Sequence, residues 1–165
     1  MGRAQKIPEA EGAGARVRTV VLRHELPDGN EHYDWLIASG TEEGSPLVTF
    51  QCARSVQEVE KSAELERIAD HRWVYLEFEG EISGNRGSVR RVAEGNVEIV
   101  EVGWIDAANA GKSPNIEALS GKQLRIEWRT NGENMKQMVR LEWGGGGKWN
   151  LFVIAENGPM RQNRE

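Results

Sequence analysis

Short runs in which polar and apolar residues alternate recur along the chain, and turn residues separate them. Three such runs follow one another near the C-terminus: Lys122–Trp128, Met135–Trp143 and Trp149–Ile154. Asn131-Gly132 joins the first two, and this dipeptide is a strong β-hairpin signal because both residues tolerate positive φ. With about eight or more runs of this kind and few helix signals, the sequence predicts a mainly β fold.

Closure of the sheet would remove free strand edges, which otherwise invite aggregation. We therefore expect a compact closed or nearly closed β-barrel with one or two short helices. Ser55–Arg67 is the helix prediction, because it is rich in helix formers and begins with a pattern that resembles a capping box. Arg72–Phe78 alternates clearly and is predicted to be a strand, with its apolar face formed by Val74, Leu76 and Phe78. Gly87–Val92 and Asn96–Val102 are predicted to be two further strands.

The length suits one domain. We expect a disordered tail over residues 1–15, a single barrel domain over 16–155 and a frayed tail over 156–165. Cys52 is the single cysteine, so no internal disulfide can form; this favours a buried small side chain and a reducing, cytoplasmic setting. No apolar run approaches the ~20 residues that a membrane span requires, and we expect no membrane partner. The net charge of -5 argues against broad electrostatic binding of nucleic acid, so any such partner must meet a local basic patch.

The three histidines of the chain, His24, His32 and His71, lie in two short polar segments. In the predicted strand that begins at His32, a period of two places His32, Asp34 and Leu36 on one face. The other face carries Tyr33, Trp35 and Ile37, a natural core face. A His-x-Asp pair is by itself most often a surface pair, but all the histidines gather in polar segments beside apolar ones.

Imidazole and carboxylate together suit a first-row metal such as Mn, Fe or Zn, and such a site leaves positions open for water and substrate. The metal could polarise a phosphoryl oxygen. His71 could act as a general acid or stabilise charge on a phosphoryl group. Tyr75 by default packs, and Arg90 and Arg91 by default form a solvated strand edge.

The residues His24, His32-Tyr33-Asp34, Asp70-His71, Tyr75 and Phe78-Glu79-Gly80 resemble the 3′-phosphoesterase domain of bacterial DNA ligase D, especially its small stand-alone members. The segments Ser83–Gly87 and Gly147–Leu151 also resemble this family. The likeness extends over nearly the whole expected domain.

The resemblance implies a β-barrel with a metal, typically manganese, that removes 3′-phosphates or a 3′-terminal ribonucleoside from nucleic-acid ends during repair. Zinc or another first-row metal is an alternative. The metal ligands would be His24, His32 and Asp34, and the catalytic residues in contact with the phosphate would be His71 and Tyr75. Leu36 stands where the family has an arginine, so the phosphate would be bound by other arginines, with the candidates Arg23, Arg72, Arg86 and Arg90. A separate ligase or polymerase is the expected partner.

Two other functions fit the same residues. A protein of this fold could bind nucleic-acid ends without turnover, and Leu36 motivates this alternative. A 2-His-1-carboxylate iron site in an oxygenase-like barrel could use His32, Asp34 and His71. In that case His24 would be dispensable.

Overall fold

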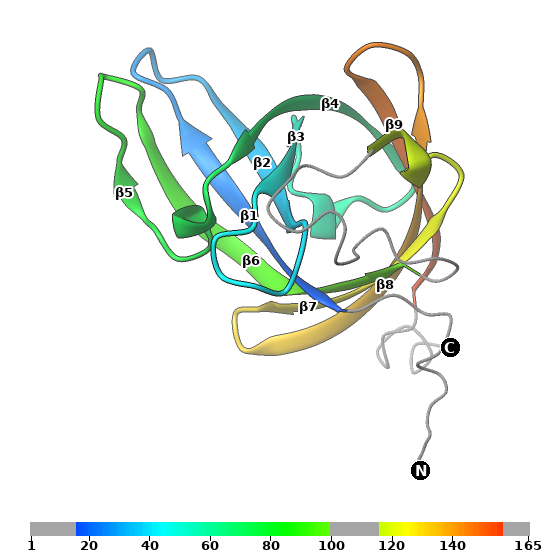
Figure 1. The fold of residues 1–165 in the computed structure, drawn as a ribbon. Helices are drawn as coiled ribbons and strands as arrows, with labels where there is room; N and C mark the ends of the chain where they lie inside the picture. Colours follow the sequence, from blue (N-terminus) through cyan, green and yellow to red (C-terminus); the bar gives the residue numbers. More distant parts are fainter. Residues whose placement is uncertain (1–15, 100–115, 157–165) are drawn as a thin grey trace.

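The computed structural model of the chain describes residues 16–99 and 116–156, which form a single antiparallel sheet (Figure 1). Around the sheet the strands follow the order β1-β2-β3-β4-β9-β8-β7-β6, and pairing of β1 with β6 closes these eight strands into a barrel. The short strand β5 (Gly80–Glu81) pairs with β6 outside the closed barrel. The prediction of a mainly β, closed barrel is therefore confirmed.

The bounds of the other described elements are as follows. The barrel strands are β1 (Val17–Glu25), β2 (Glu31–Ala38), β3 (Leu47–Cys52), β4 (Ser62–His71), β6 (Ser88–Ile99), β7 (Gln123–Thr130), β8 (Glu133–Trp143) and β9 (Lys148–Glu156). The described helical elements are 3₁₀ turns: η1 (Val56–Glu58), η2 (Trp73–Leu76) and η4 (Ile116–Leu119).

The hairpin between β7 and β8 forms where the sequence predicts it. Asn131 and Gly132 have φ of 51° and 80°, the left-handed conformation that a two-residue turn between twisted strands requires. Thr130 and Glu133 pair directly across this turn. The registers of β8 and β9 follow from it, with turn residues 144–147 joining the two strands.

The core fills the barrel. Trp35, Phe50 and Trp149 come from three strands, and Phe50 packs against both tryptophans, with ring centroids 5.8 Å from Trp35 and 5.6 Å from Trp149. The indole nitrogen of Trp35 donates a hydrogen bond of 2.8 Å to Thr19 Oγ1, so the polar atom of this buried ring has a partner. Cys52 is also buried, as expected for a small apolar side chain.

A second apolar layer covers the outside of β1 and β2. Leu22 and Leu36 alternate with the residues that face the barrel interior, yet both are fully buried. The segment that includes η2 lies against β1 on this outer side and contributes the buried Leu76, whose carbonyl accepts a hydrogen bond from Arg91 Nη1. The part of the outer face around Leu22 and Leu36 is therefore covered, where the sequence predicted one apolar face and one wet face.

The predicted helix over Ser55–Arg67 is wrong. Only the 3₁₀ turn η1 forms at its start, and most of the remainder belongs to β4. The segment has few apolar positions for a helix to bury, whereas as a strand it gains hydrogen bonds from β3 on one side and β9 on the other. Tertiary pairing here outweighs the local helix propensity.

The predicted strand over Arg72–Phe78 is also wrong, because η2 occupies this segment. Backbone hydrogen bonds from Tyr75 to Arg72 and from Glu77 to Val74 tighten it into a 3₁₀ turn. The turn rotates Val74, predicted to lie in the core, into solvent with 49% of its surface exposed. Further along the chain, one strand, β6, replaces the two strands predicted between residues 87 and 102, as far as the structure describes them.

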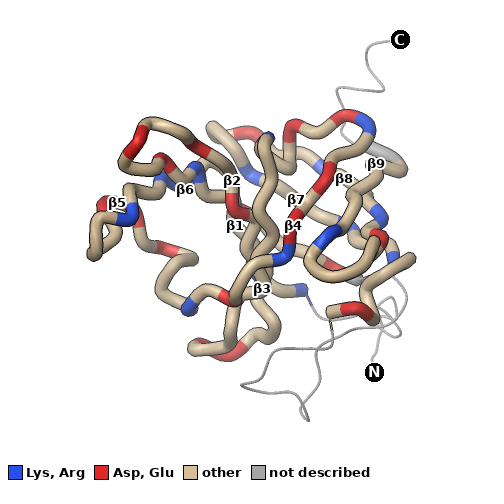
Figure 2. The backbone as a smooth tube through the Cα atoms, turned by 90° about the horizontal axis from the view of Figure 1, so that it is seen from above, with Lys and Arg blue, Asp and Glu red and all other residues tan. Residues whose placement is uncertain are grey.

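The expected tail over 1–15 and nearly all of the tail over 156–165 lie outside the described residues. Glu156 is the last residue of β9. Basic and acidic residues are interspersed around the described part of the barrel (Figure 2). No helix in the described ranges has the length and hydrophobicity that a membrane span needs.

Candidate metal centre

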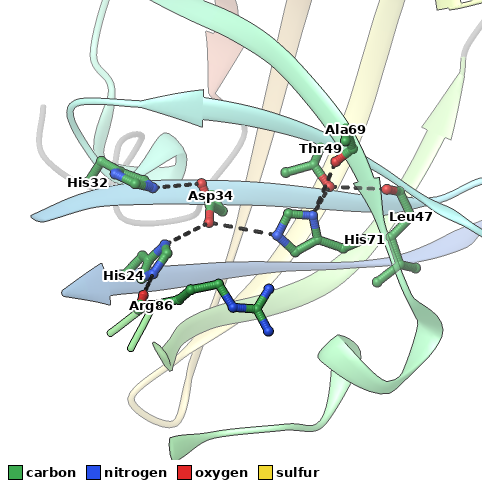
Figure 3. A network of polar contacts seen from close by, with 8 residues as sticks. All are labelled: His24, His32, Asp34, Leu47, Thr49, Ala69, His71 and Arg86. Carbon is green, nitrogen blue, oxygen red and sulfur yellow. Dashed lines mark hydrogen bonds and ion pairs between the residues drawn. The ribbon is translucent and has the colours of Figure 1, made fainter. Parts of the chain in front are cut away.

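Three of the predicted ligands come from the β1–β2 hairpin. His24 on β1 lies directly opposite His32 on β2, so the two side chains leave the same face of the sheet. Asp34 follows two residues along β2 and therefore shares that face. Figure 3 shows the His24 and His32 side chains turned toward the Asp34 carboxylate.

The donor atoms lie close together. His32 Nε2 is 3.2 Å from Asp34 Oδ1, and His24 Nδ1 is 3.6 Å from Asp34 Oδ2. One ligand atom from each of the three residues falls within 4.8 Å of the other two. Ligand atoms that each bind one ion at about 2.1 Å are about 3 to 4 Å apart. The spacing of the cluster is close to that of a metal site.

The Asp34 carboxylate is poorly satisfied by the protein. Its side chain is only 2% exposed, and Oδ1 receives no hydrogen bond from any described residue. His32 Nε2 lies near Oδ1 but is not aligned as a hydrogen-bond donor. Burial raises the pKa of Asp34, and the nearby imidazoles of His32, His71 and His24 counteract this shift. A buried carboxylate oxygen without a donor is unfavourable and would be stabilised by a cation.

The orientation of His24 adds a second argument for a cation. His24 Nε2 lies 2.8 Å from the carbonyl oxygen of Arg86. A carbonyl only accepts hydrogen bonds, so Nε2 carries the hydrogen and Nδ1 of the neutral ring is bare. The bare nitrogen faces the Asp34 carboxylate, and two electron-pair donors in this arrangement need a proton or a metal ion between them. Two imidazoles and a carboxylate suit a first-row metal, so the residues fit such an ion.

His71 completes the polar cluster from a third strand. Its Nε2 lies 4.0 Å from Asp34 Oδ2, on the side of the carboxylate that faces His24 (Figure 3). Its Nδ1 lies 3.1 Å from Thr49 Oγ1 and 3.2 Å from the carbonyl oxygen of Ala69. The compact three-residue cluster does not include His71. The geometry thus separates a set of three close ligands from one flanking imidazole.

A bulge in β4 turns His71 toward this cluster. Thr49 pairs with Ile68, but Leu47, two residues before Thr49, pairs with His71, three residues after Ile68. The extra residue in β4 reverses the inside–outside alternation, so His71 leaves the barrel on the same face as Thr49. Without the bulge its side chain would face the other side of the sheet.

Tyr75 and Arg72 lie beside His71. The ring centroid of Tyr75 is 5.3 Å from that of His71, in an edge-to-face arrangement. The guanidinium carbon of Arg72 is 6.0 Å from the centroid of the Tyr75 ring. The 3₁₀ turn η2 thus places the predicted catalytic tyrosine and one predicted phosphate ligand at the edge of the cluster.

The other predicted arginines lie differently. Arg23 forms a 2.8 Å ion pair with Glu31, and it pairs in register with Arg90 across β1 and β6. Arg23 therefore leaves the sheet on the face opposite to its chain neighbour His24, and its cross-strand partner Arg90 shares that face. The Arg86 side chain donates to the carbonyl of Ser83 at 2.7 Å, and Arg86 contacts His24 through its main chain.

Sequence reasoning missed the groups that hold the imidazoles. Thr49 and the main-chain carbonyls of Ala69 and Arg86 contact His71 or His24, and the sequence predicted none of these three contacts. A main-chain carbonyl has no sequence signal. Thr49 has none either, because it is an ordinary β-branched strand residue 22 positions before His71.

The chain matches no protein-family model and no curated protein.

Proposed function

We propose that this protein is a metal-dependent phosphoesterase that removes a 3′-phosphate or a 3′-terminal ribonucleoside from DNA or RNA ends in nucleic-acid repair. The observation that carries the proposal is the convergence of His24, His32 and Asp34 beside His71. The resemblance of the same residues to the phosphoesterase domain of DNA ligase D supports this choice among the reactions that such a centre could serve.

The metal would be held by His24, His32 and Asp34, with manganese expected and zinc or another first-row ion as alternatives. When bound, a divalent ion polarises a phosphoryl oxygen and lowers the pKa of a coordinated water. The protein side chains around it orient the substrate. Their placement decides which phosphate oxygen is protonated or hydrogen-bonded.

His71 and Tyr75 would contact the reacting phosphate. Protonated His71 donates a hydrogen bond from Nε2 to a phosphoryl or leaving oxygen, and the neutral ring accepts a proton at the same atom. The Tyr75 hydroxyl forms no hydrogen bond with any described residue, so it is available as a second donor beside His71.

Arg72 is the arginine best placed to bind phosphate. It is exposed beside Tyr75, and it forms no ion pair with a described carboxylate. Arg23, by contrast, already pairs with Glu31. An arginine fork is a strong, bidentate phosphate ligand. Arg72 would thus take the role that Leu36, fully buried beneath the outer layer, cannot take.

The burial of Leu36 also favours a second candidate, a protein of this fold that binds nucleic-acid ends without turnover. Incubation with manganese and a primer that ends in a 3′-phosphate or a single 3′ ribonucleotide separates the two candidates. Shortened or dephosphorylated primer supports the phosphoesterase. Tight end binding without any product, in the presence of manganese, would establish the non-catalytic module instead.

The same assay tests Arg72. We expect Arg72→Ala to raise the KM for the primer about tenfold or more, as the loss of a charge-assisted hydrogen bond implies. Arg129→Ala is the matched control, because Arg129 is 61% exposed and pairs with Glu94 on another part of the barrel. Equal effects of the two substitutions would indicate general electrostatic attraction and not a phosphate contact by Arg72.

Metal titration discriminates this proposal from the iron oxygenase. His24→Ala should reduce metal occupancy several-fold, and His71→Ala should leave it unchanged. The reverse result would favour the ligand set His32, Asp34 and His71.

The proposed partners follow from the product of the proposed reaction. Removal of a blocking phosphate leaves a 3′-hydroxyl, which is the group that a polymerase extends and a ligase joins. A separate ligase or polymerase would therefore use the end that this protein prepares.

A further inference from the structure

We propose that Thr49 is a positioning residue that holds His71 in one tautomer, with the hydrogen on Nδ1 and with Nε2 bare toward Asp34. The proposal rests on the proposed function, in which His71 exchanges a proton with the substrate. Thr49 lies on β3, is fully buried and does not reach the metal ligands. It would act on the reaction only through His71.

Three contacts define the arrangement. Thr49 Oγ1 lies 3.0 Å from the carbonyl oxygen of Leu47 and 3.1 Å from His71 Nδ1. The carbonyl oxygen of Ala69 lies 3.2 Å from the same Nδ1. Both carbonyls can only accept. The Thr49 hydroxyl therefore donates to Leu47, and His71 Nδ1–H donates toward Thr49 Oγ1 and Ala69.

The opposite assignment fails on the same contacts. With the hydrogen on Nε2, the Thr49 hydroxyl would have to donate to the bare Nδ1. The hydrogen bond from Thr49 Oγ1 to the carbonyl of Leu47 would then be lost, and the carbonyl oxygen of Ala69 would face the electron pair of Nδ1 at 3.2 Å. Two electron pairs at this distance repel each other, so these contacts select the Nδ1–H tautomer.

The tautomer determines which atom the site can use. His71 Nε2, which faces Asp34 Oδ2 at 4.0 Å, can accept a proton only if it is bare in the neutral ring. The ring orientation matters equally, because a flip would place a carbon where Nε2 now lies. His24 uses the opposite tautomer, with Nε2–H donating to Arg86 and Nδ1 bare. Contacts with main-chain carbonyls and with Thr49 thus leave one nitrogen of each ring without a hydrogen: Nδ1 in His24 and Nε2 in His71.

Nitrogen NMR of the metal-free protein measures this state directly. The chain has three histidines, so the His71 signals are identified by comparison with a His71→Gln variant. At a pH at which the ring is neutral, we expect a protonated Nδ1 and a bare Nε2 in the wild type. Thr49→Val, which keeps the shape but loses the acceptor, should populate the Nε2–H form. Thr49→Ser, which keeps the hydroxyl, should resemble the wild type.

Activity provides the second readout. With manganese and a primer that ends in a 3′-phosphate, Thr49→Val should lower kcat about 10- to 100-fold, the usual effect of losing a group that orients a functional histidine. KM should stay close to the wild-type value, and Thr49→Ser should restore kcat. Thr130→Val is the control, because it removes a hydroxyl at the β7–β8 hairpin, away from the site. It should change neither readout.

A protonated Nε2 in wild-type His71 overturns the proposal, and so does a Thr49→Val protein with unchanged tautomer and unchanged kcat. If Thr49→Val does not fold, the wild-type spectrum alone decides between the two tautomers. If the tautomer shifts as expected in a protein without phosphoesterase activity, Thr49 positions His71 but the proposed function fails.

Discussion

His24 and Asp34 face each other across β1 and β2, with His24 Nδ1 3.6 Å from Asp34 Oδ2. The carbonyl of Arg86 accepts a hydrogen bond from Nε2 of His24. In the neutral imidazole the other nitrogen, Nδ1, therefore carries no hydrogen and turns its electron pair toward Asp34. Two such groups at this distance are arranged for a cation. Because of this arrangement, we expect the metal-free protein to be less stable than the metal-bound protein.

Asp34→Asn should therefore have opposite effects on stability and on metal binding. Burial raises the pKa of Asp34 in the folded protein, so the ionised carboxylate favours the unfolded chain. The stability that this group contributes is present below its ordinary pKa and is lost as the pH rises through the raised folded value. At pH 7 with a chelator, Asp34→Asn should melt at a higher temperature than the wild type. With manganese, its affinity for the ion should fall at least about tenfold.

The pH dependence provides the control for Asp34→Asn. The difference in melting temperature should shrink as the pH is lowered and the wild-type carboxylate becomes protonated. A variant that is less stable than the wild type in chelator at pH 7 would show that the three imidazoles fully compensate the buried charge.

Gly87→Ala should weaken metal binding without contacting the site. Gly87 has a φ of +92°, and an added Cβ would lie 2.0 Å from the carbonyl oxygen of Glu25. The turn before β6 would have to move away from the end of β1, and the Arg86 carbonyl would then leave His24. We expect an affinity for manganese about tenfold lower, measured by calorimetry. Gly84→Ala is the control, because its φ of +82° is equally unfavourable but no backbone lies near its added Cβ. Equal losses in the two variants would point to turn strain alone.

Insertion of one alanine after Ala69 should separate metal binding from catalysis. It moves His71 one position further along β4, so its side chain should turn to the opposite face of the sheet. The ligands on β1 and β2 remain. Manganese titration should therefore give nearly wild-type affinity, while the primer assay should give no product. Retained activity would mean that His71 is not needed at the site.

Leu76→Ala should destabilise the protein by about 2 to 5 kcal/mol, because it empties a fully buried position in the outer layer. Val74→Ala, in the same 3₁₀ turn but 49% exposed, should change the free energy of unfolding by only about 0.5 kcal/mol or less. Urea unfolding measures both. Similar small losses would mean that the outer layer is not part of the cooperative core.

The sequence predicts much of this fold because strand periodicity is local. The alternation over β7 and β8 and the Asn131-Gly132 turn are enough to predict the hairpin. The same period of two places His32 and Asp34 on one face. The alternation does not predict that a second layer covers the Leu36 part of this face, because the covering residue Leu76 comes from a distant segment.

The remaining features depend on contacts far apart in the chain. The glutamates and alanines of β4 favour a helix locally, and only pairing on both sides makes them a strand. The bulge between Ile68 and His71 depends on the register with β3, so the direction of His71 cannot be predicted from its chain neighbours. Arg86 was predicted to act through its guanidinium, but its carbonyl contacts His24.

Pairing of β1 with β6 restricts how the β1–β2 hairpin can open. The hairpin that carries His24, His32 and Asp34 has a hydrogen-bonded neighbour on each side, so it cannot peel away from the sheet as a unit. Amide protons of this hairpin should exchange with solvent only when the whole barrel opens. An ion bound there would then slow exchange on the far wall, in β8 and β9, as much as beside the ligands themselves.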